Sequence, residues 1–306
     1  MECVTDFVDY WEKTDPRRVY TGASVGNSWQ WQPRNQYHVK AGARGLDWAV
    51  RPPESMTDYR GRIDSVKQPY VSHETGQWCV FPNFDEIRKY TGVNKAKNFE
   101  IFRDLLNENR MGHLSHDFVM ASGKLQALCY KHEIEKTLRT PDYAGFQLLA
   151  LNDYSGQGTA LIGLTDVFFE PKEYISAENM RRFCSPTVPL ARIPKFTYTN
   201  SETFRADIEA YHFRREPLKN ARVIYAVRDA SGAIVRKGVV RDASGKIKSG
   251  SEDIPVGNCI ELGKVVFDLK DLKAPARYNL EIRIESESLK EEDYAEVVND
   301  WDFWVY

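Results

Sequence analysis

The sequence has no long apolar run and no strong excess of either charge. Its 306 residues include 42 Lys and Arg and 44 Asp and Glu, which gives a formal net charge of -2. Nucleic acids and anionic membrane surfaces are bound through basic fields, and a membrane-spanning helix needs about 20 consecutive apolar residues. We therefore expect neither a nucleic-acid partner nor a membrane partner. The apolar fraction of 42% suffices for one large or two ordinary globular domains.

The first residues also lack the pattern of a signal peptide. Glu2, Asp6 and Asp9 stand where a basic region and an apolar core would be required. The sequence therefore shows no export signal, and by itself it assigns no compartment.

Several motifs of metal sites and enzymes are missing as well. The five Cys are odd in number, widely spaced and without a CxxC or Cys/His pattern, so we expect no zinc site, no disulfide framework and no cofactor. His113 and His116 have no third ligand nearby. The Gly-x-Ser-x-Gly elbow of many hydrolases is absent, and Gly156-Gln-Gly158 lacks the Lys-Ser/Thr ending of a phosphate loop.

What stands out instead is the stretch from Gln68 to Trp78. A short β-branched run stops at Gly76, and His73, Glu74 and Trp78 gather at its end. A carboxylate at the end of a strand, beside an imidazole and an indole, is typical of a site. The alternative is that Glu74 pairs with an Arg for structural reasons and that Trp78 belongs to a core.

The first two thirds of the chain read as an α/β region. Apolar residues at three-and-four spacing predict helices at 84–90, 95–111 and 115–140. The apolar run Gly145–Leu151 predicts a parallel strand covered on both faces, and it ends in Asn152 and Asp153. Polar clusters at strand ends indicate a (β/α)8 TIM-type barrel. Only about four strands precede Pro186, so we expect an incomplete barrel over residues 1–190.

The last third alternates with period two and predicts an all-β domain. Turn signals at 229–232 and 242–245 separate expected strands at 203–210, 221–228, 264–269 and 278–284. We expect an immunoglobulin-like β-sandwich over 191–306, preceded by a linker at 185–195 that holds three prolines. The aromatic stretch Asp300–Tyr306 stops without a turn, so we expect the sandwich to be truncated at its C-terminal end.

These segments resemble glycoside hydrolase family 2, in particular its β-galactosidase-like members. The resemblance rests on Asp15–Ser24, Pro69–Trp78, Gly145–Asp153 with Gly156-Gln-Gly158, and the direct passage into a sandwich. Such enzymes join sandwich domains to a central catalytic barrel. The resemblance implies that this chain corresponds to the second half of the barrel and the following sandwich, and family members are often periplasmic or secreted.

The resemblance also implies residue roles. The family's nucleophilic glutamate ends the seventh barrel strand, which corresponds to Glu74, and the eighth strand corresponds to 146–151 with Asn152 and Asp153 at the mouth of the site. The family's acid/base glutamate follows an Asn at a strand end. Here Asn107-Glu108 and Glu178-Asn179 lie on predicted helices, so we expect the acid/base to be missing from this chain.

The resulting hypothesis is a fragment of a retaining exo-acting β-glycosidase that takes the end of a β-linked oligosaccharide or polysaccharide. Trp29, Trp31 and Trp78 would be stacking walls for the sugar, and His73 would orient the carboxylate or bind the sugar. The tryptophans could equally be core residues, His73 could be packed, and Asp153 could cap its loop. The partner would be the missing N-terminal half of the enzyme. The alternative function is a non-catalytic carbohydrate-binding or assembly subunit.

Overall fold

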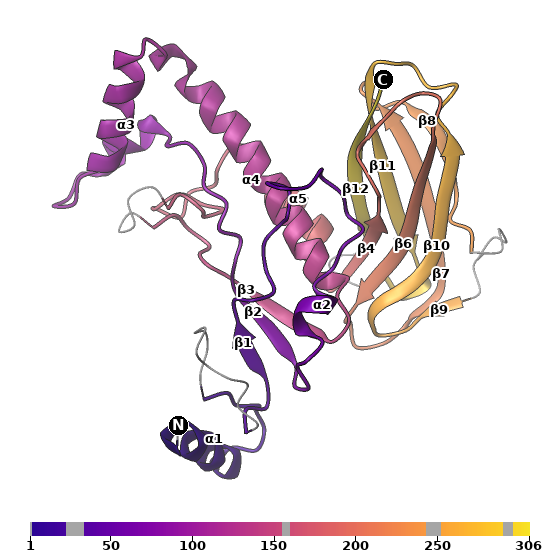
Figure 1. Cartoon of the computed structure of the whole chain (residues 1–306), viewed down its shortest axis with the longest axis horizontal. Helices are drawn as coiled ribbons and strands as arrows, with labels where there is room; N and C mark the ends of the chain where they lie inside the picture. Colours follow the sequence, from indigo (N-terminus) through magenta and orange to yellow (C-terminus); the bar gives the residue numbers. More distant parts are fainter. Residues whose placement is uncertain (1, 23–33, 155–159, 243–251, 290–295) are drawn as a thin grey trace. The chain divides into compact units, whose positions relative to one another are not determined.

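The computed structural model describes residues 2–22, 34–154, 160–242, 252–289 and 296–306. The chain forms two compact units. Unit 1 comprises Met1–Gly45, Val66–Glu133 and Ala144–Met180, and unit 2 comprises Leu46–Ser65, Ile134–Tyr143 and Arg181–Tyr306. No helix in the described part is long and apolar enough to cross a membrane. The colours of Figure 1 follow the chain through both units.

Unit 1 is built around a small sheet of order β1-β2-β3 (Figure 1). Strands β1 (His38–Lys40) and β2 (Tyr70–Thr75) are parallel, with His38 opposite Tyr70, and β3 (Tyr143–Leu148) follows β2. The helical elements are α1 (Glu2–Thr14), α2 (Arg60–Ile63, in unit 2), η1 (Phe84–Lys89), α3 (Lys97–Glu108), η2 (Gly112–Leu114), α4 (Ser115–Leu138) and α5 (Ala177–Phe183). Both α4 and α5 extend from unit 1 into unit 2.

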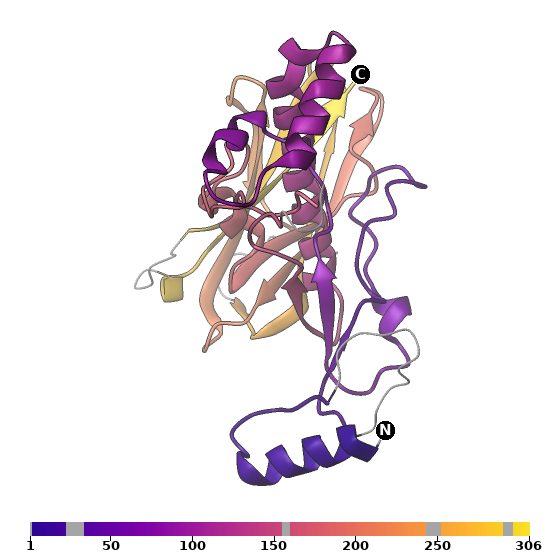
Figure 2. The same ribbon diagram turned by 90° about the vertical axis from the view of Figure 1, so that its left-hand side faces the viewer.

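Aromatic packing explains how η1, α3 and α4 come together in unit 1. The Phe81 ring lies 5.6 Å from Phe84, 6.3 Å from Phe102 on α3 and 5.4 Å from Phe118 on α4, measured between centroids. Figure 2 shows α3 and α4 joined through the short turn η2. The three-and-four spacing of apolar residues predicted these helices, and their apolar sides meet on Phe81.

The prediction of a half barrel over residues 1–190 is wrong. The sheet of unit 1 contains three strands in the described part of the chain, which is richer in strand than in helix. The segment 18–22, part of the Asp15–Ser24 stretch that carries the family resemblance, has no regular structure. The apolar run 145–151 overlaps β3 and is only partly buried. It therefore lacks the cover on both faces that its apolar composition suggested.

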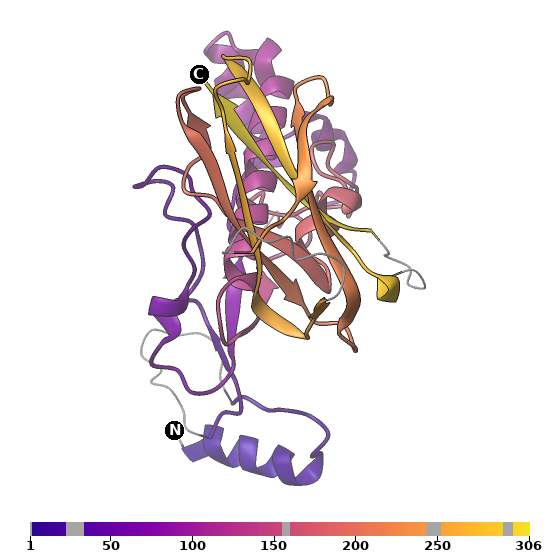
Figure 3. The same cartoon turned by 90° about the vertical axis from the view of Figure 1, so that its right-hand side faces the viewer.

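Unit 2 is a β-sandwich with one large core (Figure 3). One sheet has the order β10-β6-β4 and the other β5-β12-β11-β7-β8, with β9 paired to β7; apart from the parallel β5–β12 pair, neighbours are antiparallel. The strands are β4 (Thr187–Arg192), β5 (Thr197–Tyr198), β6 (Thr203–His212), β7 (Leu218–Asp229), β8 (Ile234–Val239), β9 (Glu252–Ile254), β10 (Gly257–Asp268), β11 (Ala276–Glu285) and β12 (Val297–Val305).

Alternation places apolar side chains of both sheets in this core. On β6, Phe204, Ala206 and Ile208 are each at most 2% exposed while their neighbours face outward. Phe204 meets Phe303 of β12 with ring centroids 4.6 Å apart. Full burial of such side chains contributes roughly 1.5–3 kcal/mol each, so the contact between the two sheets stabilises the sandwich.

The prediction of a linker at 185–195 is also wrong. Residues 187–192 form β4, which is almost entirely buried and pairs with β6, Pro189 lying opposite Ala210. Proline lacks the N–H that a central strand needs, but β4 is an edge strand of its sheet, where that loss is tolerated. The sandwich therefore includes residues that composition alone assigned to a linker.

A buried ionic cluster lies at the end of α4 within unit 2. Glu135 is 0% exposed and accepts hydrogen bonds from Asn299 Nδ2 at 2.8 Å, Trp301 Nε1 at 3.0 Å and the Arg139 guanidinium at 3.2 Å. Arg139 is 1% exposed, and burial lowers its pKa. Removal of one partner from such a pair leaves an uncompensated charge in the interior.

We predict that Glu135→Gln lowers the free energy of unfolding by about 3 kcal/mol or more, because Arg139 stays buried and charged without its carboxylate. Urea denaturation followed by tryptophan fluorescence measures this loss. The control is Glu285→Gln, because Glu285 forms an exposed pair with Arg222 at 4.0 Å and such pairs contribute about 0–1 kcal/mol. Equal losses in the two variants would contradict the prediction.

Candidate functional site

Glu74 sits near the end of β2 on an unusual stretch of backbone. Its φ of 56° and that of Gly76, 82°, lie in the left-handed region, which costs a non-glycine residue about 1–3 kcal/mol. A Cβ at Gly76 would lie 2.0 Å from the ring of Tyr130. The Tyr130 hydroxyl donates to the Gly76 carbonyl at 2.8 Å, so α4 packs closely against the turn that presents Glu74.

Three side chains surround the Glu74 carboxylate. Arg44 lies 3.2 Å and the Gln77 amide nitrogen 3.2 Å from Oε2, whereas His73 Nε2 lies 3.4 Å from Oε1. Arg44 also donates to the carbonyls of His73 at 2.7 Å and Glu74 at 3.0 Å. The Glu74 side chain is 35% exposed, so this carboxylate is both fixed by donors and open to solvent.

Glu133 of α4 supports this cluster from the interior of unit 1. It is 2% exposed, and it accepts hydrogen bonds from the Gly45 N–H at 2.7 Å and Trp78 Nε1 at 2.7 Å. Burial raises the pKa of Glu133, while these two donors and the charge of Arg44 lower it. Glu133 thereby holds both the loop that carries Arg44 and the indole of Trp78.

The structure groups some of the residues predicted from sequence and separates others. His73 and Glu74 are neighbours in one cluster, and His73 Nδ1 lies 3.3 Å from the side-chain oxygen of Gln147. Trp78 is half-buried against Glu133. Trp29 and Trp31 lie outside the described residues. Their roles, like those of the other residues, stay predictions.

Asn152 and Asp153 are not among the partners of Glu74. Asp153 is buried, and it accepts from Lys172 Nζ at 2.8 Å and from the Gly163 N–H at 2.8 Å. Asn152 donates to the Asp153 carbonyl at 3.0 Å. Both residues therefore hold together their own loop, which is what the loop-capping alternative for Asp153 predicts.

Sequence reasoning missed the two residues that build the Glu74 cluster from a distance, Arg44 and Glu133. The Gly42–Gly45 loop was visible as Gly-rich, and it follows β1, which is parallel to β2. Loops after neighbouring parallel strands meet at one edge of a sheet, so Arg44 could have been proposed. The alternative reading of Glu74 as a carboxylate paired with an Arg agrees with the Arg44 contact.

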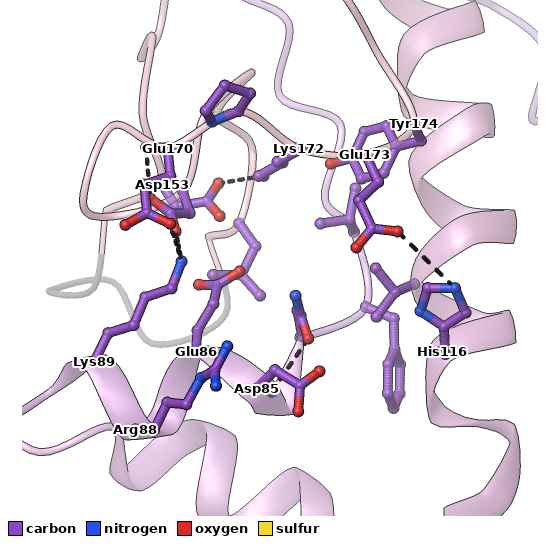
Figure 4. Close-up of a pocket in the computed structure, with 17 residues that line it drawn as sticks. Asp85, Glu86, Arg88, Lys89, His116, Asp153, Glu170, Lys172, Glu173 and Tyr174 are labelled. Carbon is purple, nitrogen blue, oxygen red and sulfur yellow. Dashed lines mark hydrogen bonds and ion pairs between the residues drawn. The ribbon is translucent and has the colours of Figure 1, made fainter.

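A cavity of about 240 Å³ lies elsewhere in unit 1, and no sequence motif predicted it (Figure 4). Two ion-paired lysines line it: Lys89 lies 2.5 Å from Asp166 and 2.7 Å from Glu170, and Lys172 lies 2.8 Å from Asp153. The apolar lining includes Val80, Phe81, Val119, Leu161 and the ring of Tyr174.

Glu86 of η1 faces the same cavity (Figure 4). The side chain of Asn83 caps the start of η1 by accepting from the Asp85 N–H at 3.1 Å, which fixes the first turn. Glu86 is 6% exposed, and its buried Oε2 has no hydrogen-bond partner among the described residues. Burial, followed by the charges of Asp166 and Asp153, raises the pKa of Glu86 to about 7. The described residues contain no group of three His, Cys, Asp or Glu arranged to hold a metal ion.

Comparisons by sequence cover a minority of the chain. The model of a domain of unknown function, DUF8488, matches residues 202–306, which correspond to the sandwich from β6 onward. No curated protein matches the sequence.

Solved structures with some similarity include glycoside hydrolases. Parabacteroides merdae β-glucuronidase is 14% identical over 40% of this chain and 14% of its own, with a TM-score of 0.26. Bacteroides uniformis β-glucuronidase 2, covalently bound to cyclophellitol-6-carboxylate aziridine, is 11% identical, covers 99% of this chain and 30% of its own, and has a TM-score of 0.33.

Another similar structure has no stated enzymatic activity. The CARDB domain of a Pyrococcus furiosus protein, in complex with di-metal ions, is 8% identical over 39% of this chain and 91% of its own, with a TM-score of 0.27. The chain thus spans less than a third of either glucuronidase, and at these scores none of the similarities assigns an activity to it.

We predict that Glu86→Gln stabilises the protein at pH 8 and leaves it nearly unchanged at pH 5. The folded-state pKa of Glu86, about 7, lies above its ordinary value of 4.5. Its protonation therefore stabilises the fold fully at low pH, and this contribution is lost as the pH rises from about 4.5 to about 7. One pKa unit corresponds to about 1.4 kcal/mol, so the gain at pH 8 is roughly 3 kcal/mol. Urea denaturation at both pH values tests this, and an equal effect at pH 5 and pH 8 would show that the ionisation of Glu86 is not involved.

Proposed function

We propose that this chain is part of a retaining, exo-acting β-glycosidase similar to the β-galactosidase-like members of glycoside hydrolase family 2, with Glu74 as its nucleophile. The observation that carries the proposal is the setting of Glu74. It is a solvent-reachable carboxylate near a strand end, on strained backbone, and it is held by Arg44, His73 and Gln77. Strained residues with organised polar neighbours concentrate at functional sites. The resemblance of the Pro69–Trp78 segment supports the same residue independently.

The two oxygens of Glu74 are held unequally, and this suggests which of them attacks. Oε2 has two partners at 3.2 Å, Arg44 and Gln77, whereas Oε1 has only His73 at 3.4 Å. An oxygen with fewer hydrogen bonds keeps a lone pair available for a new bond. In the proposal, Oε1 attacks the anomeric carbon to form the glycosyl-enzyme, while Arg44 and Gln77 hold Oε2 in place.

Retaining hydrolysis also needs a second carboxyl group about 5–5.5 Å from the first, to protonate the leaving oxygen and later to activate water. The family's acid/base follows an Asn at a strand end, whereas Asn107-Glu108 lies on α3 and Glu178-Asn179 on α5. In the proposal the acid/base role therefore falls to a residue of another polypeptide. The partner of this chain is then the polypeptide that carries that group.

The remaining predicted residues would bind the sugar. In the proposal, Trp78, Trp29 and Trp31 offer ring faces to the pyranose, and His73 donates to a sugar hydroxyl when it is not engaged with Glu74. Asn152 and Asp153 would contact the sugar only if their loop approaches Glu74 when a ligand is bound. Their present hydrogen bonds stay within that loop.

The Arg44 contact favours one alternative, a non-catalytic carbohydrate-binding or assembly subunit. A carboxylate whose main partner is a guanidinium has the arrangement of a structural ion pair. In this alternative the Glu74 cluster shapes a sugar-binding surface and forms no covalent bond.

The two functions are distinguished by covalent trapping. We expect a 2-deoxy-2-fluoro β-glycoside with a dinitrophenolate leaving group to add one glycosyl unit to Glu74, because such a leaving group departs without protonation and so bypasses the missing acid. A panel of β-galactoside, β-glucuronide, β-glucoside and β-mannoside reagents would be tested by intact-protein mass spectrometry and peptide mapping. Glu74→Gln should slow labelling on the order of 10³-fold or more.

The matched control for this experiment is Glu108→Gln, an exposed glutamate on α3 that should label like the unaltered protein. Labelling of Glu74→Gln at the unaltered rate, or attachment to another residue, would remove Glu74 as the nucleophile. Sugar binding by calorimetry without any labelling would favour the non-catalytic subunit.

A further inference from the structure

The cavity at Glu86 is separate from the proposed nucleophile and has a chemistry of its own. None of the residues that line it is a partner of the Glu74 side chain. At about 240 Å³ it is smaller than the roughly 300–1,000 Å³ of typical sites for drug-sized ligands. Whatever binds here is a compact molecule.

The cavity contains an acceptor that the protein leaves unused. No described side chain or backbone N–H donates a hydrogen bond to the buried Oε2 of Glu86, and the residue is 6% exposed. A buried polar group without a partner destabilises the fold, and more so when it is charged. Figure 4 shows the Glu86 carboxyl reaching from η1 toward Lys89 and the Asp153–Lys172 pair, within the cavity. A ligand that donates hydrogen bonds would supply what Glu86 lacks.

The charges around the cavity indicate that this donor is a cation. The two lysines are already ion-paired: Lys89 pairs with Asp166 and Glu170, and Lys172 pairs with Asp153. The remaining basic side chain, Arg88, is exposed. Six carboxyl groups face these three basic groups, and the carboxyls are Asp85, Glu86, Asp153, Asp166, Glu170 and Glu173. Lys172 and Lys89 act on Glu86 only through their nearby charges. The carboxyl groups thus outnumber the basic groups of this cavity, and Oε2 of Glu86 has no hydrogen-bond donor among the described residues.

A bare metal ion does not fit this requirement, whereas an ammonium group does. Metal ions in proteins need several ligands converging on one point, and no such group of three occurs in the described part of the chain. An ammonium group carries three N–H donors and one positive charge. The Tyr174 ring on the cavity wall already has an ammonium group near its face, because Lys172 Nζ lies 6.0 Å from its centroid.

We propose that this cavity binds a small primary ammonium compound, with the Glu86 carboxylate as its counter-ion and principal hydrogen-bond acceptor. The proposal does not depend on the proposed function of Glu74. A bound ammonium compound would bring a positive charge and N–H donors to the Glu86 carboxyl group. Oε2 of that group has no hydrogen-bond partner in the described part of the chain.

The proposal predicts a specific pH dependence. Glu86 must be ionised to receive the ammonium group, and its pKa is about 7. Binding should therefore be about tenfold weaker at pH 6 than at pH 8, with a proton released on binding at pH 6. Other charged and titratable groups line the cavity and contribute to the pH dependence of binding. They are Asp85, Arg88, Lys89, His116, Asp153, Asp166, Glu170, Lys172, Glu173 and Tyr174.

The experiment is an NMR titration of the whole ¹⁵N-labelled chain with n-butylamine and, as a neutral molecule of the same shape, n-butanol. We expect saturable shifts with the amine at pH 8, a dissociation constant about tenfold larger at pH 6, and at least tenfold weaker binding of butanol. Glu86→Gln should weaken amine binding at least tenfold at pH 8, whereas Glu108→Gln should bind like the unaltered chain.

Several results would overturn the proposal. Absence of saturable amine binding at pH 8 would mean that water alone fills the cavity, and butanol binding as tightly as the amine would mean that charge is not recognised. Amine binding by Glu86→Gln at the unaltered strength would place the ligand elsewhere. Comparison of the thermal unfolding of Glu86→Gln with that of the unaltered chain excludes a folding defect. A second variant, Asp166→Asn, breaks the ion pair with Lys89 and frees that lysine to neutralise Glu86. This variant should also weaken amine binding.

Discussion

The arrangement around Glu74 depends on one buried carboxylate, Glu133. Its hydrogen bonds from the Gly45 N–H and from Trp78 Nε1 tie the loop after β1 and the chain after β2 to the same point on α4. Because Gly45 is held, the adjacent Arg44 is positioned to reach the Glu74 carboxylate and the two carbonyls beside it. The burial of Glu133 opposes its ionisation and the two donors favour it. The geometry of the exposed carboxylate therefore rests on an acceptor that solvent hardly reaches.

Local patterns predicted the secondary structure of the sandwich much better than the architecture of unit 1. Alternation at 203–210 and 278–284 corresponds to β6 and β11, because one face of each strand is buried in a shared core. The barrel failed because the number of strands in a sheet depends on pairing between distant segments, which no local period records. Pro189 led to the opposite error, the prediction of a linker where the chain forms a strand. A proline suggests a break, yet an edge strand accommodates it beside Ala210.

The candidate sites show the same limit. The position of Glu74 near a strand end was visible in the sequence, but its main partner is 30 residues away and the supporting Glu133 is 59 residues from Glu74. At the cavity, Lys89 and Asp166 are 77 residues apart. Nothing in the segment 84–89 marks Glu86 as buried, because a glutamate in a short helical turn is ordinarily solvated. Its burial comes from loops that are far away in the sequence.

Glu74 and Glu86 lie in the same unit, and their surroundings suit them to opposite tasks. The protein supplies Glu74 with three partners and leaves it open to solvent, so the carboxylate is already organised before any ligand arrives. Oε2 of Glu86 receives no donor from the described chain, and burial among other carboxylates opposes its ionisation more strongly than the charges of Lys172 and Lys89 favour it. The first arrangement suits a group that must react, because its orientation is fixed in advance. The second suits a group that must recognise, because an unsatisfied acceptor makes binding depend strongly on whether the ligand brings a donor and a positive charge.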